Sequence, residues 1–222
     1  MRAIYATLAR NKGFIAFLFG MLVLRSAIAD WNVVPTGSMQ PTIRIGDRIM
    51  VDKLAYDLRL PFTHVSLVHL SDPKRGDIVV LDSSAANEKL VKRVVGVPGD
   101  VVMLRNNRLI VDAQPARYHP VVVQGIRDDT QEPAHYEMES LAGEKHLIRL
   151  SSLLRAQDFG PVIVPPGHYL LLGDNRDNSA DSRYYGFFPR NEITGRATRV
   201  AVSLDPSNHY LPRRDRTGLK LQ

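Results

Sequence analysis

The chain has 222 residues, enough for one domain or two small ones with a real hydrophobic core. It contains no cysteine, which excludes disulfide bonds and cysteine-ligated metals. The formal net charge of +6 would suit an anionic membrane surface or nucleic acid. The basic residues form no single dense block and are not interleaved with aromatic residues, so we expect membrane lipid rather than nucleic acid as a partner.

The N-terminal segment has the pattern of a membrane anchor. Residues 1–12 carry three basic side chains and no acidic one, and residues 13–24 are almost wholly apolar. A spanning helix needs about 20 residues, and residues 13–29 reach the lower limit of about 17 if Arg25 snorkels to the headgroups. We therefore predict one transmembrane helix within residues 1–30, with the N-terminus inside because the positive charge lies there. A cleavable signal peptide has the same charged start and apolar middle and remains an alternative.

Short runs of apolar and β-branched residues, separated by turn residues, follow this segment and predict strands. Helical patterns are few, so the rest of the chain is expected to be mainly antiparallel β-sheet. The predicted strands are 49–54, 77–81, 89–97, 101–104, 109–111, 146–151, 168–172 and 194–204, with a hairpin turn at 105–108.

Residues 112–165 differ from their surroundings, because they are rich in Pro, His, Gln and acidic residues and show weak periodicity. We interpret them as part of a smaller inserted β lobe, residues 106–165. The main antiparallel β-sheet domain would then comprise residues 31–105 and 166–210. Residues 211–222 would form a solvated basic tail.

Several well-known site patterns are missing from the sequence. It has no His-Glu-x-x-His zinc motif, no P-loop and no Gly-x-Ser-x-Gly elbow. The acidic loop 174–179 has Arg at its third position and Ser where a calcium loop needs Gly. We therefore predict no metal and no cofactor. The seven histidines are scattered, and spacing alone does not exclude one of them as a catalytic base.

Two residues stand out as a possible nucleophile and base. Ser38 lies between Pro35 and Pro41 and is either a turn residue or a nucleophile. Lys92 lies in an apolar strand, where alternation places it on the same face as Leu90 and Val94. Arg93 lies on the other face and cannot lose its proton. A lysine can act as a base at neutral pH only if burial lowers its pKa. The alternative is a sheet edge with Lys92 in water.

Four segments, in order, carry a family resemblance. They are Pro-Thr-Gly-Ser-Met-Gln-Pro-Thr at 35–42, Arg-Gly-Asp-Ile-Val at 75–79, Val-Lys-Arg-Val-Val-Gly-Val-Pro-Gly-Asp at 91–100, and Gly-Asp-Asn-Arg-Asp-Asn-Ser-Ala-Asp-Ser-Arg-Tyr-Tyr-Gly at 173–186. Each resembles one of the conserved boxes of bacterial type I signal (leader) peptidases. The resemblance covers roughly residues 31–203, and the apolar segment before the first box also fits that family.

The resemblance implies a Ser–Lys dyad, with Ser38 as the nucleophile and Lys92 as its general base. The Ser38 backbone N–H and the Thr36 hydroxyl would form the oxyanion hole, although many family members carry Ser at the position of Thr36. Ser179 matches the residue that orients the lysine amine. Further positions match supporting residues, namely Asp174, Asp181, Arg183 and Arg93.

The resemblance also implies the substrate and the location. The family removes signal peptides from exported preproteins after Ala-x-Ala-like ends, through shallow apolar pockets. The matching pocket positions are Val34, Met39, Ile43, Leu90 and Val91. The expected location is the bacterial cytoplasmic (inner) membrane, with a single span and an extracytoplasmic catalytic domain.

Other functions stay open at the level of sequence. A specialised relative, such as a maturation peptidase of a conjugation system, would share the dyad. A non-catalytic, anchored β module that binds exported chains would explain the apolar segment and the strands, but it needs no serine beside a buried lysine. Self-cleaving repressors use Ser–Lys chemistry but are soluble and carry a DNA-binding domain.

Overall fold

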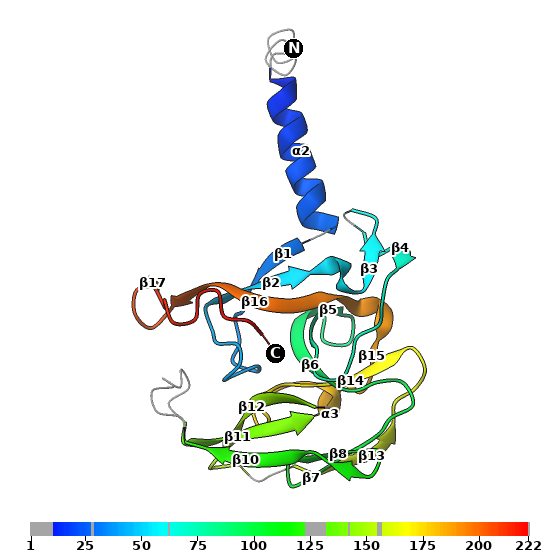
Figure 1. Cartoon of the computed structure of the whole chain (residues 1–222), viewed down its shortest axis with the longest axis vertical. Helices are drawn as coiled ribbons and strands as arrows, with labels where there is room; N and C mark the ends of the chain where they lie inside the picture. Colours follow the sequence, from blue (N-terminus) through cyan, green and yellow to red (C-terminus); the bar gives the residue numbers. More distant parts are fainter. Residues whose placement is uncertain are drawn as a thin grey trace.

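A single large antiparallel sheet forms the centre of the molecule (Figure 1). The computed structural model describes residues 11–27, 29–61, 63–122, 132–141, 143–154 and 157–221. The order of the strands in the sheet is β1-β2-β16-β5-β6-β14-β15, and β17 pairs with β16. Their bounds are β1 Ala29–Val33, β2 Asp47–Asp52, β5 Ile78–Ser83, β6 Glu88–Gly96, β14 His168–Leu172, β15 Phe188–Pro189, β16 Ile193–Asp205 and β17 Leu211–Pro212.

Three smaller sheets surround the main one. The first has the order β13-β7-β8-β9, the second β10-β11-β12, and the third is the two-stranded ribbon β3-β4. The first two lie at the end of the molecule remote from the N-terminal helix (Figure 1). The bounds are β3 Asp57–Arg59, β4 Ser66–His69, β7 Val101–Arg105, β8 Arg108–Val111, β9 Gln114–Pro115, β10 Arg117–Val121, β11 Ala134–Leu141, β12 Glu144–Ser151 and β13 Phe159–Ile163. The short helices are α3 Ser182–Tyr185, η1 Lys53–Ala55 and η2 Arg190–Glu192.

The prediction of a mainly β, antiparallel fold is confirmed. The predicted hairpin at 105–108 joins β7 to β8, with Arg105 opposite Arg108. This hairpin belongs as a whole to the four-stranded sheet, so the boundary we placed after residue 105 cuts through it. The strand predicted at 49–54 ends at Asp52, because the chain turns there into η1.

The main sheet is buried on both faces near its centre, which explains the continuous apolar run of β5. Val79 and Leu81 pack into one buried cluster, and Ile78 and Val80 pack into another. A strand covered on both sides needs apolar side chains at successive positions. A third cluster packs the main sheet against the four-stranded sheet; it includes Val95, Val102, Leu104 and Leu170.

Helix α2 (Lys12–Ala27) precedes the sheet and extends away from it (Figure 1). It has 16 residues and ends two residues before the predicted limit, because Ala29 already begins β1. Its described side chains from Phe14 to Leu22 are exposed and largely apolar. Within residues 11–27 and the other described ranges, no helix is both long and apolar enough to cross a membrane. Residues 1–10 and 28 of the predicted anchor lie outside the described residues.

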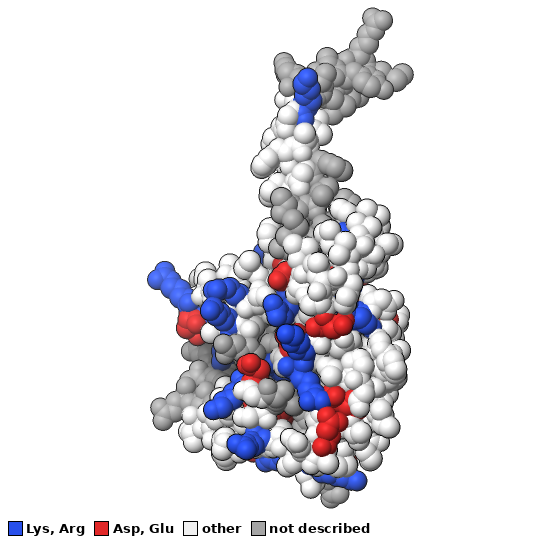
Figure 2. All heavy atoms as spheres, turned by 45° about the vertical axis from the view of Figure 1, so that its right-hand side comes forward, with Lys and Arg blue, Asp and Glu red and all other residues white. Residues whose placement is uncertain are grey.

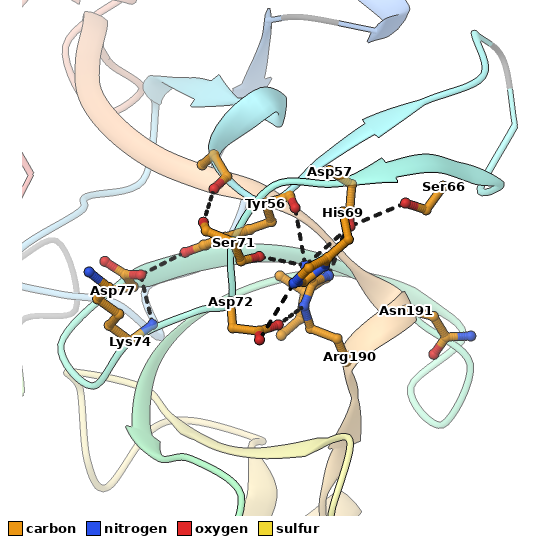
Figure 3. A network of polar contacts seen from close by, with 12 residues as sticks. Tyr56, Asp57, Ser66, His69, Ser71, Asp72, Lys74, Asp77, Arg190 and Asn191 are labelled. Carbon is orange, nitrogen blue, oxygen red and sulfur yellow. Dashed lines mark hydrogen bonds and ion pairs between the residues drawn. The ribbon is translucent and has the colours of Figure 1, made fainter.

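The β3–β4 ribbon is held to the main sheet by a polar network at its base (Figure 3). Arg190 donates to both carboxylate oxygens of Asp57, at 2.9 and 3.2 Å, and to Asp72 at 3.0 Å. Arg59 also donates to Asp57, and to the backbone oxygen of Ile193 at 2.5 Å. Strand β4 is exposed along its whole length, so these bonds at its base hold the ribbon to the main sheet.

The C-terminal segment is ordered against the main sheet, contrary to the solvated tail that we expected. Arg216 is buried and donates to the carboxylate of Asp47 at 2.6 Å. The backbone N–H of Leu221 donates to the carbonyl of Thr198, and the Leu221 side chain packs against the buried cluster that contains Ile78. The basic residues of this segment therefore contribute to tertiary structure.

Candidate active site

Ser38 lies in a tight turn between β1 and β2. The backbone N–H of Gln40 donates to Gly37 O at 3.1 Å, and that of Ile43 donates to Met39 O at 2.9 Å. Met39 and Ile43 are buried, so this turn is packed onto the sheet and does not extend into solvent. The packed turn therefore holds the Ser38 hydroxyl in a defined position.

Lys92 lies directly against this serine. Its Nζ atom is 2.7 Å from Ser38 Oγ, although the two residues are 54 positions apart in the sequence. Lys92 lies in β6, which pairs with β5 on one side and β14 on the other, and the side chain is 3% exposed. The alternative of a lysine at a sheet edge in water is therefore wrong.

Burial has a direct consequence for the charge of this lysine. Desolvation lowers the pKa of Lys92 from 10.5 to about 8, while the carboxylates of Asp181 and Glu88 act in the opposite direction. A substantial fraction of the amine is therefore neutral at mildly alkaline pH. With the amine neutral, the separation of 2.7 Å lets the Ser38 hydroxyl donate its proton to Nζ.

The residue after Lys92 makes a buried ion pair beneath the site. Arg93 donates to both oxygens of Asp174, each at 2.7 Å, and to the carbonyl of Gly76 at 2.8 Å. The Thr42 hydroxyl donates to the same carboxylate at 2.5 Å. Although burial alone would raise the pKa of Asp174, the Arg93 guanidinium holds it below its ordinary value. Thr42, Gly76, Arg93 and Asp174 each belong to a different one of the four segments singled out in the sequence. The ion pair and its hydrogen bonds therefore link all four segments.

A second ion pair shapes the loop after β14. Arg183 donates to both oxygens of Asp181, each at 2.8 Å, and the backbone N–H of Gly173 donates to Asp181 at 3.0 Å. Asp181 also caps the start of α3 through the backbone N–H of Arg183. The loop is therefore fixed at both ends by one carboxylate.

Gly173 leaves no room for a side chain. A Cβ atom there would lie 2.3 Å from Ser179 Oγ and 2.4 Å from the backbone oxygen of Ser38. Ser179 Oγ is buried beside Asp181, whose pKa it helps to lower, and among the described residues no hydrogen bond joins it to Lys92. Its role in orienting the lysine stays a prediction.

Comparison with known proteins identifies the family of this chain. The family model described as signal peptidase, peptidase S26, matches residues 8–202. The chain belongs to this signal peptidase family. Signal peptidase I of Pseudomonas fluorescens and that of Pseudomonas aeruginosa are each 38% identical to it over 223 residues, covering 94% of this chain and 78% of their own. A crystal structure of a signal peptidase I from Enterococcus faecalis is 27% identical and covers 58% of this chain and 99% of its own, with a TM-score of 0.36.

The signal peptidase chain gathers most, but not all, of the predicted pocket residues. Val34, Met39 and Ile43 share one buried cluster, and Val91 packs against it. Leu90 lies in a different cluster, on the face of β6 that also carries Val94. The five predicted pocket residues therefore do not form one group. Thr36 is exposed, two residues before Ser38.

Sequence reasoning missed a buried charge network that joins the lobe to this peptidase site. Arg176 donates to both oxygens of Glu139, at 2.8 and 2.6 Å, and His146 lies 3.1 Å from Glu139 and 4.0 Å from Asp174. Glu139 is fully buried, and the guanidinium of Arg176 holds its pKa well below the ordinary value despite that burial. Charged residues in weakly periodic strands give no local signal of such pairing.

Sequence reasoning also did not assign Asn175 and Arg149, two residues from the same region, to the site. The backbone N–H of Asn175 donates to Ser38 O at 3.0 Å, and Arg149 contacts Asn175 from strand β12. Asn175 lies inside the fourth segment that carried the family resemblance, so that segment was the available signal. Within the described residues, no group of three or more His, Cys, Asp or Glu side chains could hold a metal ion.

Proposed function

We propose that the chain is a membrane-anchored serine endopeptidase that removes signal peptides from exported preproteins. Ser38 is the nucleophile and Lys92 is its general base. The observation that carries this proposal is the 2.7 Å separation between Lys92 Nζ and Ser38 Oγ at a lysine that is 3% exposed. Membership of the signal peptidase family supports the substrate class.

The proposed reaction follows from the position of the two groups. Neutral Lys92 accepts the Ser38 proton while Oγ attacks the scissile carbonyl. The Ser38 N–H and the Thr36 hydroxyl stabilise the oxyanion that forms. Lys92 then passes the proton to the leaving amine, which gives an acyl-enzyme. Water attacks this ester, with Lys92 again as base, and releases the signal peptide and free Ser38.

Small residues at the cleavage site fit the proposed apolar pockets. Val34, Met39 and Ile43 share one aliphatic cluster against which Val91 packs, and these four residues would form the pocket walls. Leu90 is not part of them, because it lies in the cluster on the other face of the sheet. Walls this tightly packed favour Ala over larger side chains, as in an Ala-x-Ala end. An extended substrate would pair with an exposed strand edge, and β1 forms one edge of the main sheet.

Membrane attachment is supported by two neighbouring apolar surfaces. The first is helix α2, whose exposed side chains include Phe14, Phe17 and Leu22. The second is the β3–β4 ribbon, where residues 60–71 contain no Asp, Glu, Lys or Arg and where Leu67 and other aliphatic side chains are exposed. Figure 2 shows few charged side chains on α2 and the surface beside its end, whereas acidic and basic side chains gather farther from the helix.

We propose that the chain lies in the bacterial cytoplasmic membrane with a single span, as the family resemblance implies. The basic residues 1–12 put the N-terminus inside, so that the β-sheet body is extracytoplasmic. Lipid is then a partner of α2 and of the ribbon. An anchor close to Ser38 raises its effective concentration at the outer membrane surface, where cleavage sites emerge.

One experiment tests the dyad. The full chain in detergent is incubated with a preprotein whose signal peptide ends in Ala-x-Ala, and cleavage is followed for the wild type, Ser38→Ala, Lys92→Ala and Lys92→Arg. All three variants should be inactive, since a guanidinium does not lose its proton. Lys89→Ala is the matched control, because Lys89 lies in the same strand but is exposed. Undiminished cleavage by Lys92→Ala would refute Lys92 as the base.

A further inference from the structure

Asn175 hydrogen-bonds to two successive backbone carbonyl groups, those of Gly37 and Ser38. Its backbone N–H donates to Ser38 O at 3.0 Å, and its side-chain Nδ2 donates to Gly37 O at 3.0 Å. Asn175 is 0% exposed, so water does not compete for either bond. Asn175 therefore attaches the two backbone carbonyls at Gly37 and Ser38 to the loop after β14.

The bond to Gly37 O has a geometric consequence for the next N–H. The Gly37–Ser38 peptide is trans, so its C=O and N–H point in opposite directions. Because Gly37 O is held toward Asn175, the Ser38 N–H is directed away from Asn175. Within the described residues this N–H donates to no protein group, so it is free to meet an oxyanion.

We infer that Asn175 is a positioning residue that orients the Ser38 N–H as an oxyanion donor. This inference rests on the proposed function, because it assigns a role within the same reaction. Asn175 acts through the Gly37–Ser38 peptide and does not touch the substrate. Its side chain prevents that peptide from rotating when negative charge develops on the scissile oxygen.

The inserted lobe sets the orientation of the Asn175 amide. Arg149, in strand β12, donates from Nη1 to Asn175 Oδ1 at 3.3 Å. A guanidinium can only donate, so it selects the amide orientation in which oxygen faces Arg149 and NH₂ faces Gly37. The backbone of Arg149 also donates to Asp174 O at 2.9 Å and accepts from Arg176 N at 3.0 Å. Strand β12 thus clamps the segment that contains Asn175, which connects the lobe to the oxyanion hole.

The test replaces the amide by an isosteric carboxylate. Asn175→Asp keeps the backbone bond to Ser38 O and an acceptor for Arg149, but it removes the donor to Gly37 O. Removal of an oxyanion donor lowers kcat by about 10²–10³-fold, so loss of its positioning residue should lower kcat by about 10- to 100-fold, with KM changed less than about 3-fold. Rates are measured on the alkaline plateau, so that a change in the pKa of Lys92 does not enter the comparison. Asn175→Ala removes the same donor without adding a charge and should likewise lower kcat with little change in KM.

A pair of inhibitors separates positioning from general disruption. A peptide aldehyde ending in Ala-x-Ala forms a tetrahedral adduct as Ser38 Oγ bonds to the aldehyde carbon, and its oxygen lies in the oxyanion hole. The corresponding peptide alcohol binds but forms no adduct. Both Asn175 variants should lose affinity for the aldehyde by the same factor as kcat, and should keep affinity for the alcohol within about 2-fold. Asn191→Asp is the control, since it makes the same chemical change at an exposed asparagine.

The possible outcomes separate this inference from the proposed function. Wild-type kcat and aldehyde affinity in folded Asn175→Asp and Asn175→Ala would overturn the positioning role, while cleavage by the wild type and its loss in Ser38→Ala would leave the peptidase intact. Equal losses of aldehyde and alcohol affinity would also overturn it, because they indicate a general structural role. A wild-type chain that cleaves no preprotein refutes the proposed function, and the inference with it.

Discussion

The buried lysine should destabilise the fold that it serves, and its removal should make the protein more stable. Burial lowers the pKa of Lys92 from 10.5 to about 8. At pH 7 the folded state therefore holds a protonated lysine at a cost of about 3 kcal/mol relative to the unfolded chain. The hydrogen bond to Ser38 returns about 1 kcal/mol. We expect Lys92→Met, which keeps the length and the apolar stem, to be more stable than the wild type by about 2 kcal/mol at pH 7.

The sign of the pH dependence follows from the same shift. Between pH 8 and 10.5 the unfolded chain binds more protons at Lys92 than the folded chain does, so wild-type stability rises with pH through that window. The cost falls to about 1 kcal/mol at pH 10, which cancels the hydrogen-bond term. The advantage of Lys92→Met should therefore decline from about 2 kcal/mol at pH 7 to about zero at pH 10.

Urea unfolding of the full chain in nonionic detergent measures this difference. With a slope of about 2 kcal/mol per molar urea, the midpoint of Lys92→Met should lie about 1 M higher at pH 7 and should coincide with that of the wild type at pH 10. Lys89→Met is the control, because Lys89 is 44% exposed, and its change should stay within about 0.5 kcal/mol. A Lys92→Met variant less stable than the wild type at pH 7, or an advantage independent of pH, would refute the reasoning.

Three further outcomes are expected. Cleavage of an Ala-x-Ala peptide should increase with pH through a midpoint near 8, as Lys92 loses its proton, and a rate that stays flat from pH 6 to 10 would contradict this. Gly173→Ala should lose cleavage and more than about 2 kcal/mol of unfolding free energy, because its Cβ would lie 2.4 Å from Ser38 O, whereas the open Gly20→Ala should be tolerated. Arg190→Ala should speed hydrogen exchange of the β3–β4 amides (Figure 3), while peptide cleavage stays within about 2-fold; unchanged exchange would show that the ribbon does not depend on this side chain.

Strand β6, which carries Lys92, shows how much of the site the sequence pattern predicted. Alternation in β6 placed Lys92 on the face of Leu90 and Val94, and both of these residues do share one buried cluster. The same pattern left open whether the strand was an edge, because alternation describes one strand and not its neighbours. Pairing with β5 and β14 answered that question. Likewise, the charge of residues 211–222 predicted a solvated tail. In the structure Arg216 instead bonds to Asp47, which lies 169 positions earlier in the sequence.

By itself, the sequence determined the class of fold, the family and the chemistry available to Ser38 and Lys92. The family came from the resemblance of four segments to its conserved boxes. The fold class and the chemistry follow from local facts: apolar alternation specifies strands, turn residues separate them, and only a buried amine can serve as a base at moderate pH. Tertiary structure alone decided how the site is assembled. Asn175 meets Gly37 across 138 positions, and Arg149 reaches Asn175 from a lobe whose sequence shows little periodicity. Hydrogen bonds between segments so far apart depend on how the sheets pack, which no local pattern encodes.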